Sequence, residues 1–569
     1  MSELLLEPLK YYETVGREKH RENVRQELER RVALSGVDPE QNKKTATAYK
    51  AKLGEMQKLE KKLSLKRFFR VLLILVAIVG GFLIIGGIAA SPVLIPIGVV
   101  LVAVPLLVIF LRLNKTLKYF SETLAQKQAE AQTLLDTAWR EMAPLNALLG
   151  ERDAIDLMQK TLPEIEFDRF YSAERERELR ELCAYAPEPD DERSILDILS
   201  GEYKGNPFLF ERQLRHRMGE ETYHGHLTIS WTETYRDSKG NLRTRLRTQT
   251  LHASVVKPKP FYHQNTVLKY FPQGAPDLSF SREGLYHDDK SEKQIERLVK
   301  KGEKKLKKKA EEALEQGKSF TEMNNTEFEV LFDALNRDNE VQFRMMFTPL
   351  AQNNMVDLMR SEVGYGDDFD FYKSKRMTTI HSDHAQKWRM DASSAHCRSY
   401  DLEEIQRNFQ AFHEEYFKSV FFDFAPLLAV PMYQDKPARS LDPLREYKVN
   451  YTAGEYETLV NRMDLSRLVA KESKTRAILK ATGLSHTEEA DTVEIRALSY
   501  RTVMHTDYVP RVGGDGRTHL VPVPWTEYIP IERTSYIEVS PRLEDAGECA
   551  VAYHGLSAKF LEENIKENE

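Results

Sequence analysis

The segment from Val71 to Leu111 constrains this chain most, because its forty-one residues include no charged side chain. That length is about twice what one helix needs to cross the hydrocarbon core of a bilayer. Ser91 and Pro92 interrupt the run near its middle and break helical hydrogen bonding there. The sequence therefore predicts two transmembrane helices, over about residues 70–89 and 95–112, that form a hairpin with a short link.

Basic residues flank both ends of this run, while the link between the two predicted spans is uncharged. The flanking residues are Lys58, Lys61, Lys62, Lys66, Arg67 and Arg70 before the run, and Arg112, Lys115 and Lys118 after it. Because basic flanks stay on the cytoplasmic side, we expect a two-span protein of the inner (plasma) membrane with both termini in the cytoplasm. A cleaved signal peptide is excluded, because the run starts some seventy residues into the chain. A core hairpin of a soluble protein rarely stays uncharged for this length.

Apolar stripes at helical spacing lie on both sides of the predicted anchor. Helices are predicted over residues 12–34 and 45–70 before it, and a third is predicted over residues 117–145 after it. We expect the last two to pair as an antiparallel cytoplasmic stalk, with a homo-oligomeric coiled coil as the alternative. The glycines of the first span serve close helix packing, either between chains or within the hairpin itself; they are Gly80, Gly81, Gly86 and Gly87.

The rest of the chain mixes helical and strand patterns, which predicts an α+β soluble domain. Residues 224–236 and 242–256 read as a β-hairpin, and residues 492–540 read as strands divided by a Gly513–Gly516 turn. Residues 328–336 read as a strand, and residues 341–360 read as a strand followed by a helix. The predicted parts are N-terminal helices (1–69), the hairpin (70–112), the stalk (113–165), an α+β domain (166–400) and a C-terminal α+β region (401–569).

Composition excludes several classes of protein. The net charge is −6 with 30% charged residues, so nothing global suggests nucleic-acid binding. The three cysteines, Cys183, Cys397 and Cys549, are far apart and form no CxxC pair. They predict neither a disulfide framework nor a zinc knuckle, which fits a reducing cytoplasm. No motif in the chain calls for a cofactor.

One stretch carries a family resemblance. Its motif residues are Phe328, Glu329, Phe332, Asp338, Thr348, Pro349 and Leu358, with YKGNPFLF upstream of them. This pattern resembles an uncharacterised bacterial family of membrane-anchored proteins, in which a domain of unknown function follows two transmembrane helices. The match spans roughly residues 160–390, while the basic helix and the C-terminal region depart from the family pattern. The resemblance implies architecture, since the family has no assigned activity.

The densest group of potential metal ligands comprises His381, His384, His396 and Cys397, near Asp383 and Asp391. Imidazole and thiolate together suit zinc, although the spacing matches no established zinc signature. The alternative is that these are ordinary surface or hydrogen-bonded loop residues.

A lysine-rich helix is predicted over residues 290–318. Five of its lysines are candidates for binding anionic headgroups at the membrane surface: Lys300, Lys301, Lys304, Lys305 and Lys308. One alternative is a solvated helix that packs its apolar stripe on its own domain. The other is RNA or DNA binding, which no interleaved aromatic residues support.

These features favour a membrane-tethered cytoplasmic binding or scaffold module over an enzyme. Its expected partners are the lipid bilayer and a protein, and self-association is an open alternative. The alternative function is a membrane-anchored hydrolase or metal-dependent enzyme that uses the segment from His381 to Cys397. A channel or transporter subunit ranks last, because the spans contain no ionisable residue.

Overall fold

The chain divides into two compact units. The computed structural model describes residues 4–89, 94–183, 185, 190–236, 238–284, 292–317, 320–387, 390–435, 451–487, 490–541, 551–553 and 556–561. The first unit, here the α+β unit, comprises Met1–His20, Ala154–Ala392 and Glu415–Glu569. The second, here the helical unit, comprises Arg21–Asp153 and Ser393–Glu414. Helices and strands are both abundant, so the predicted α+β class is confirmed.

Long helices make up most of the helical unit. They are α2 (Arg17–Ser35), α3 (Pro39–Ala89), α4 (Leu94–Val108), a π-helical turn (Ile109–Leu113) and α5 (Asn114–Ala147), together with the first part of α13 (Leu402–Leu428). The stretches Pro39–Ile85 and Ile95–Ala147 are long and apolar enough to cross a membrane. The predicted break at Ser91 and Pro92 lies outside the described residues.

The apolar parts of α3 and α4 leave their large side chains exposed. Phe82 is 70% exposed, Ile88 is 75% exposed and Phe110 is 77% exposed. A helix in the core of a soluble protein would bury such residues, because each gains about 1.5–3 kcal/mol from leaving water. These surfaces are therefore suited to an apolar surrounding.

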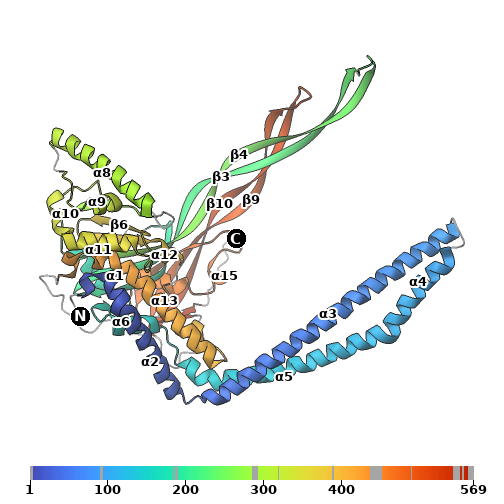
Figure 1. Cartoon of the computed structure of the whole chain (residues 1–569), viewed down its shortest axis with the longest axis horizontal. Helices are drawn as coiled ribbons and strands as arrows, with labels where there is room; N and C mark the ends of the chain where they lie inside the picture. Colours follow the sequence, from blue (N-terminus) through green and yellow to red (C-terminus); the bar gives the residue numbers. More distant parts are fainter. Residues whose placement is uncertain are drawn as a thin grey trace. The chain divides into compact units, whose positions relative to one another are not determined.

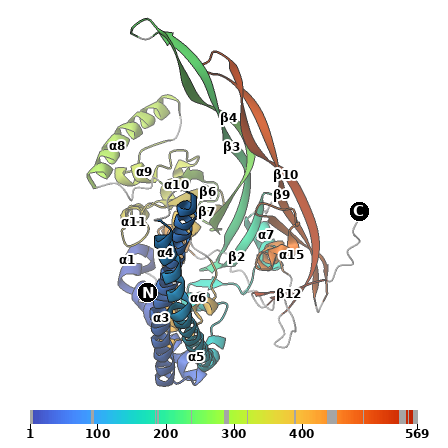
Figure 2. The same cartoon turned by 90° about the vertical axis from the view of Figure 1, so that its right-hand side faces the viewer.

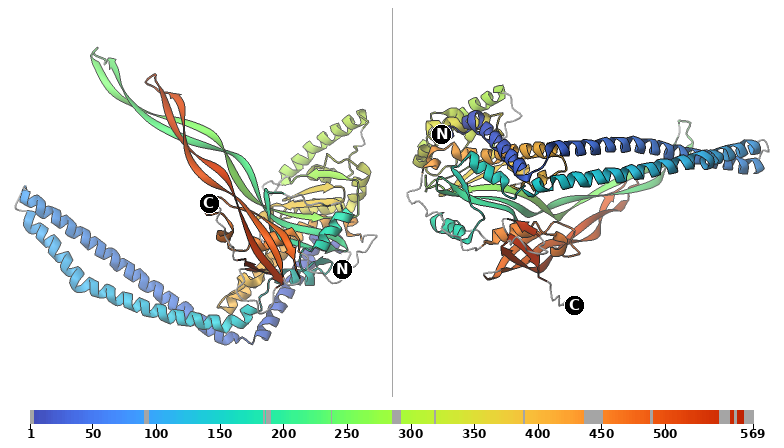
Figure 3. Two further views of the ribbon diagram at one scale, coloured as in Figure 1. Left: turned by 180° about the vertical axis from the view of Figure 1, so that it is seen from behind. Right: turned by 90° about the horizontal axis from the view of Figure 1, so that it is seen from below.

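Helix α3 packs on α4 through a glycine and on α5 through charged pairs. A Cβ added at Gly80 would lie 2.8 Å from Leu101 Cβ and 2.9 Å from the Gly98 carbonyl oxygen, whereas one at Gly81 would meet nothing within 4 Å. Further along, α3 and α5 run antiparallel, side by side (Figure 3). Lysine–glutamate ion pairs of 2.7 and 2.6 Å join them; the pairs are Lys52–Glu130 and Lys127–Glu55.

The α+β unit contains two antiparallel sheets. Its strands are β1 (Ile165–Phe167), β2 (Arg193–Tyr203), β3 (Asn206–Arg236), β4 (Leu242–Tyr270), β5 (Ser279–Arg282), β6 (Phe369–Ser374), β7 (Met377–Ser382), β8 (Ile478–His486), β9 (Asp491–Val512), β10 (Thr518–Pro541), β11 (Val551–Tyr553) and β12 (Leu556–Phe560). The strand orders are β1-β2-β3-β4-β7-β6-β5 and β11-β12-β10-β9-β8.

The α+β unit also contains helices. They are α1 (Pro8–Tyr11), α6 (Asp153–Thr161), α7 (Ala173–Cys183), α8 (Glu292–Glu315), α9 (Thr326–Phe332), α10 (Glu340–Met346), α11 (Pro349–Arg360), α12 (Asp383–Lys387), the second part of α13, α14 (Ala453–Val460) and α15 (Leu465–Leu468). The predicted lysine-rich helix is confirmed as α8, and the predicted hairpins are confirmed as β3–β4 and β9–β10.

Two strands predicted near the family-like stretch are wrong. Residues 326–332 and 340–346 form α9 and α10 instead. The Asn325 side chain accepts a hydrogen bond from Phe328 N, and the Asn339 side chain accepts one from Gln342 N. Asparagine caps satisfy free amides at a helix start, so these short apolar runs fold as helices despite their strand-like composition.

Both long hairpins extend beyond their sheets as two-stranded ribbons that lie side by side (Figure 1 and Figure 2). Pairing of β2 with β3 ends at Arg215, whereas β3 and β4 stay paired as far as Arg236 and Leu242. A small apolar core joins the two ribbons; it comprises Ile229, Leu251, Ala253, Val521 and Val523. Isolated two-stranded ribbons are marginal in water, and this shared core gives each a packed face.

Candidate functional site

The four predicted metal ligands fall in different units. His381 on β7 and His384 on α12 belong to the α+β unit, while His396 and Cys397 lie in a 3₁₀ turn of the helical unit. Among the residues that the structure describes, no group of three or more His, Cys, Asp or Glu side chains is placed to hold a metal ion. The shared metal site thus gains no support from the described part of the chain.

His384 belongs to a buried ion network. Its Nδ1 lies 2.5 Å from Asp368 Oδ2, and its Nε2 lies 3.1 Å from the Ser419 carbonyl oxygen and 3.4 Å from Asp423 Oδ1. Burial acts to lower the pKa of His384, but the carboxylates of Asp423 and Asp368 outweigh it and raise this pKa above 6.5. Burial also raises the pKa of Asp423 to about 6.

Both ring nitrogens of His384 therefore have partners inside the unit, and Tyr365 stacks on the ring with a centroid distance of 3.8 Å. His381 is held separately, with Nδ1 3.3 Å from Asn265 Oδ1, and burial lowers its pKa. These contacts support a structural role for both histidines.

The surroundings of Cys397 and His396 likewise give no support for a metal site or an active site. The Cys397 side chain is fully buried, and burial raises the pKa of its thiol to about 12. A thiol with that pKa stays protonated at neutral pH and is a poor nucleophile or metal ligand. His396 is exposed and packs edge-on against Phe412 at 4.2 Å. The hydrolase alternative gains no support from this pair.

Helix α8 turns its apolar stripe toward its own unit. Leu306 is buried, and a Cβ at Gly302 would lie 2.4 Å from a methyl group of Val330 on α9. Lys309 Nζ donates to the Leu335 carbonyl and lies over the Phe320 ring. This packing agrees with the predicted solvated helix on its own domain.

The five candidate lysines remain exposed on the outer part of α8. Lys308 has a weak ion pair, 3.6 Å from Glu312, which is four residues away on the same helix. The other four side chains also face solvent; they belong to Lys300, Lys301, Lys304 and Lys305. Membrane-surface binding by this face therefore stays a prediction.

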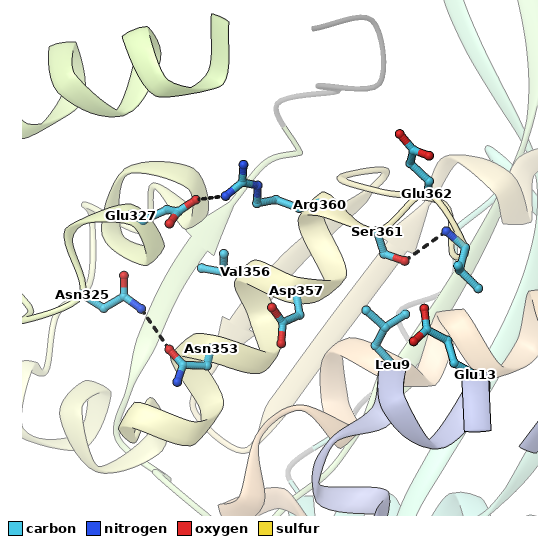
Figure 4. Close-up of a pocket in the computed structure, with 11 residues that line it drawn as sticks. Leu9, Glu13, Asn325, Glu327, Asn353, Val356, Asp357, Arg360, Ser361 and Glu362 are labelled. Carbon is cyan, nitrogen blue, oxygen red and sulfur yellow. Dashed lines mark hydrogen bonds and ion pairs between the residues drawn. The ribbon is translucent and has the colours of Figure 1, made fainter. Parts of the chain in front are cut away.

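A shallow pocket lies in the α+β unit (Figure 4). Its volume is about 540 Å³, and α1, α9 and α11 contribute to its lining. Two neighbouring hollows of about 320 and 530 Å³ share Asn353 with it. Asn325 Nδ2 donates to Asn353 Oδ1 at 3.3 Å, and Arg360 forms a 2.7 Å ion pair with Glu327.

Carboxylates dominate the lining of this pocket. Glu13, Glu327, Asp357 and Glu362 line it, and Arg360 is the one cationic residue among its lining residues. Burial, with a contribution from the nearby carboxylate of Glu7, raises the pKa of Asp357. A negatively charged hollow with amide groups suits a ligand that brings positive charge and hydrogen-bond donors.

The family-like motif has structural roles in this unit. Phe328, Phe332 and Phe347 pack together with ring centroids 4.9–5.1 Å apart. Glu329 forms a 2.7 Å ion pair with Arg337, and both side chains are 1% exposed. Thr348 caps α11, whose first residue is Pro349. The motif thus stabilises α9, α10 and α11, and residues of α9 and α11 also line the pocket.

Comparison with known proteins adds no relative. No family model, no curated protein and no solved structure matches the chain. The family resemblance drawn from the residues at 326–358 therefore remains a prediction.

Sequence reasoning missed the pocket and the His384 network. The pocket joins residues near the N-terminus to residues beyond 320, and His384 contacts carboxylates 16 and 39 positions away. No local sequence pattern predicts contacts between residues this far apart in the chain. A capping signal was readable, however, since Asn325, Asn339 and Thr348 each precede a helix start.

Proposed function

We propose that this chain is a membrane-tethered binding module, with α3 and α4 in the inner membrane as a hairpin and with both termini in the cytoplasm. The observation that carries the proposal is the exposure of large apolar side chains from Leu65 to Leu111 on helices of spanning length. Basic residues at both ends of this region and the uncharged link support the orientation. The paired α3 and α5 then continue both spans into the cytoplasm as a helical stalk.

The binding role of the α+β unit rests on the acidic pocket. Its carboxylates and amides suit a segment of a partner protein that carries lysine or arginine. The exposed lysines of α8 are proposed to contact anionic headgroups or an acidic partner. The hydrolase alternative has less support, because Cys397 is buried and His384 is fully engaged by its neighbours.

The tether is tested on the full chain, tagged in turn at each terminus. We expect the protein to resist alkaline carbonate extraction. We also expect an added protease to cleave both tags in inverted membrane vesicles and neither tag in spheroplasts. Release by carbonate, or protection of one tag in the inverted vesicles, would refute the two-span arrangement.

The binding role is tested by affinity purification from native membranes. A basic partner recovered with wild type should be lost with Asp357→Asn/Glu362→Gln, which neutralises two carboxylates of the pocket. The control is Glu494→Gln/Glu532→Gln on the β9–β10 ribbon, which removes the same charge away from the pocket lining. Equal recovery with both variants would exclude the pocket as the binding site.

A further inference from the structure

The end of the β3–β4 ribbon extends past the ribbon that packs on it. The β9–β10 turn contacts this ribbon at Gln249, whose side-chain oxygen accepts a hydrogen bond from Gly514 N at 2.7 Å. A Cβ at Gly514 would also lie 2.8 Å from the Trp231 ring. Residues 232–248, here the ribbon end, follow these contacts, and nearly all of those described are exposed.

The ribbon end is cationic, although the whole chain is acidic. It contains Arg236, Lys239, Arg243, Arg245 and Arg247 against Glu233 and Asp237, a net charge of +3 in a chain of net charge −6. Glu233 lies 2.8 Å from the guanidinium groups of both Arg245 and Arg247, so one carboxylate serves two arginines. The net positive charge of the ribbon end attracts an external anion.

The ribbon end also exposes large apolar side chains. Leu242 is 69% exposed, Leu246 is 72% exposed and Tyr235 is 40% exposed. Leu242 and Leu246 lie four positions apart on β4, so they project from one face, while Arg243, Arg245 and Arg247 project from the other. Exposed leucine and tyrosine beside arginine are the side chains that interfacial membrane-binding segments combine.

The ribbon is long. From Arg215, where pairing with β2 ends, to Arg236 it extends about 70 Å at roughly 3.3 Å per residue. The polar part of α3, from Pro39 to Arg70, is only about 47 Å long at roughly 1.5 Å per residue. The ribbon is thus longer than the polar part of the helix that is proposed to continue into the bilayer.

We propose that the ribbon end docks on the anionic phospholipid headgroups of the membrane that holds α3 and α4. The arginines bind lipid phosphate groups, and Leu242 and Leu246 enter the boundary between headgroups and acyl chains. This inference rests on the proposed membrane tether and adds a second contact with the same bilayer. Nucleic acid is the less favoured occupant, because exposed leucines add nothing to phosphate binding.

Trypsin tests the docking on the full chain, because it cleaves after the exposed arginines of the ribbon end. The protein is placed in nanodiscs of phosphatidylcholine alone or with phosphatidylglycerol, and cleavage at residues 243–247 is followed by mass spectrometry. We expect cleavage at least tenfold slower with phosphatidylglycerol, and we expect high salt to abolish the protection. Cleavage at the exposed Lys471 should be equal in both nanodiscs.

A pair of variants separates docking from simple shielding. Leu242→Ser/Leu246→Ser keeps every trypsin site and should lose most of the protection, whereas Thr232→Ser/Thr244→Ser, on the same face of the same ribbon, should keep it. Equal cleavage in both nanodiscs, or protection by an added oligonucleotide but not by phosphatidylglycerol, would overturn the proposal. Failure of the chain to enter nanodiscs would instead refute the proposed tether.

Discussion

The helical unit exposes apolar side chains, whereas the α+β unit buries charged ones. Phe82 and Phe110 on the apolar helices are 70% and 77% exposed, while Arg337 and Glu329 in the α+β unit are each 1% exposed. The difference shows that the two regions suit different surroundings. Exposed leucine and phenylalanine suit hydrocarbon, where backbone groups must bond within the helix. Buried charges suit a protein interior in which every charge has a partner.

The largest change in stability is expected when one partner of a buried ion pair is removed. Arg337→Met leaves Glu329 and Glu340 without their shared cation, which lies 2.7 Å from each. We expect a loss of about 3–5 kcal/mol in unfolding free energy, measured by denaturant titration of the full chain in detergent. Arg496→Met, which breaks an exposed pair with Glu532, should cost under about 1 kcal/mol. Similar losses would mean that the Arg337 network is not effectively buried.

A charge placed on the apolar helices tests the other half of the comparison. Ile78→Arg should cost about 2.5–3.5 kcal/mol for insertion and lower the carbonate-resistant fraction of the protein, because Ile78 is 49% exposed within the apolar region. Gln57→Arg on the polar part of the same helix should leave that fraction unchanged. Full membrane integration of the Ile78 variant would argue that this surface does not face lipid.

Two neighbouring glycines, Gly80 and Gly81, allow a comparison within the apolar region itself, because only Gly80 lies in close contact with α4. Gly80→Val should destabilise the packing of α3 on α4 by about 1–3 kcal/mol, because the added atoms meet Leu101 and the Gly98 backbone. Gly81→Val should have little effect, since a Cβ there meets nothing within 4 Å. Thermal denaturation in one detergent compares the two variants, and equal melting temperatures would exclude the close approach at Gly80.

The smallest effect concerns the pH dependence of the buried network. The pKa of His384 is raised above 6.5 in the folded protein, so its protonation stabilises the fold below pH 6.5. That contribution is lost as the pH rises from 6.5 through the higher folded pKa, at no more than about 1.4 kcal/mol per pH unit. Asp423, with a pKa of about 6, changes its protonation below this pH range. His384→Gln should remove the slope above pH 6.5 in melting curves, and an unchanged slope would assign it to another group.

Several elements were predictable because their signals are local. The uncharged run to Leu111, the alternation in residues 224–236 and the lysine-rich pattern of α8 each determine structure through neighbouring residues. The strands predicted at residues 328–336 and at the start of residues 341–360 were wrong, because strand-like composition does not reveal the effect of the asparagine caps. Short apolar runs are ambiguous between strand and helix, and the cap decides between them.

The candidate sites were less predictable. Sequence spacing grouped His381 to Cys397, yet the structure assigns these residues to separate units with separate partners. The acidic pocket and the ribbon pair depend on residues hundreds of positions apart, such as Leu9 with Asp357 and Ile229 with Val521. Such contacts form only after chain elements pack.

The sequence by itself determined that two helices can cross a bilayer, that long hairpins exist and that no established catalytic motif is present. Those properties follow from the length of an apolar run and from periodicity, which neighbouring residues fix. Only the tertiary structure decided which charges are buried together, where the pocket lies and which end of the β3–β4 ribbon stays uncovered. Those properties depend on long-range packing, because burial and charge pairing are set by residues that the chain brings together from distant positions.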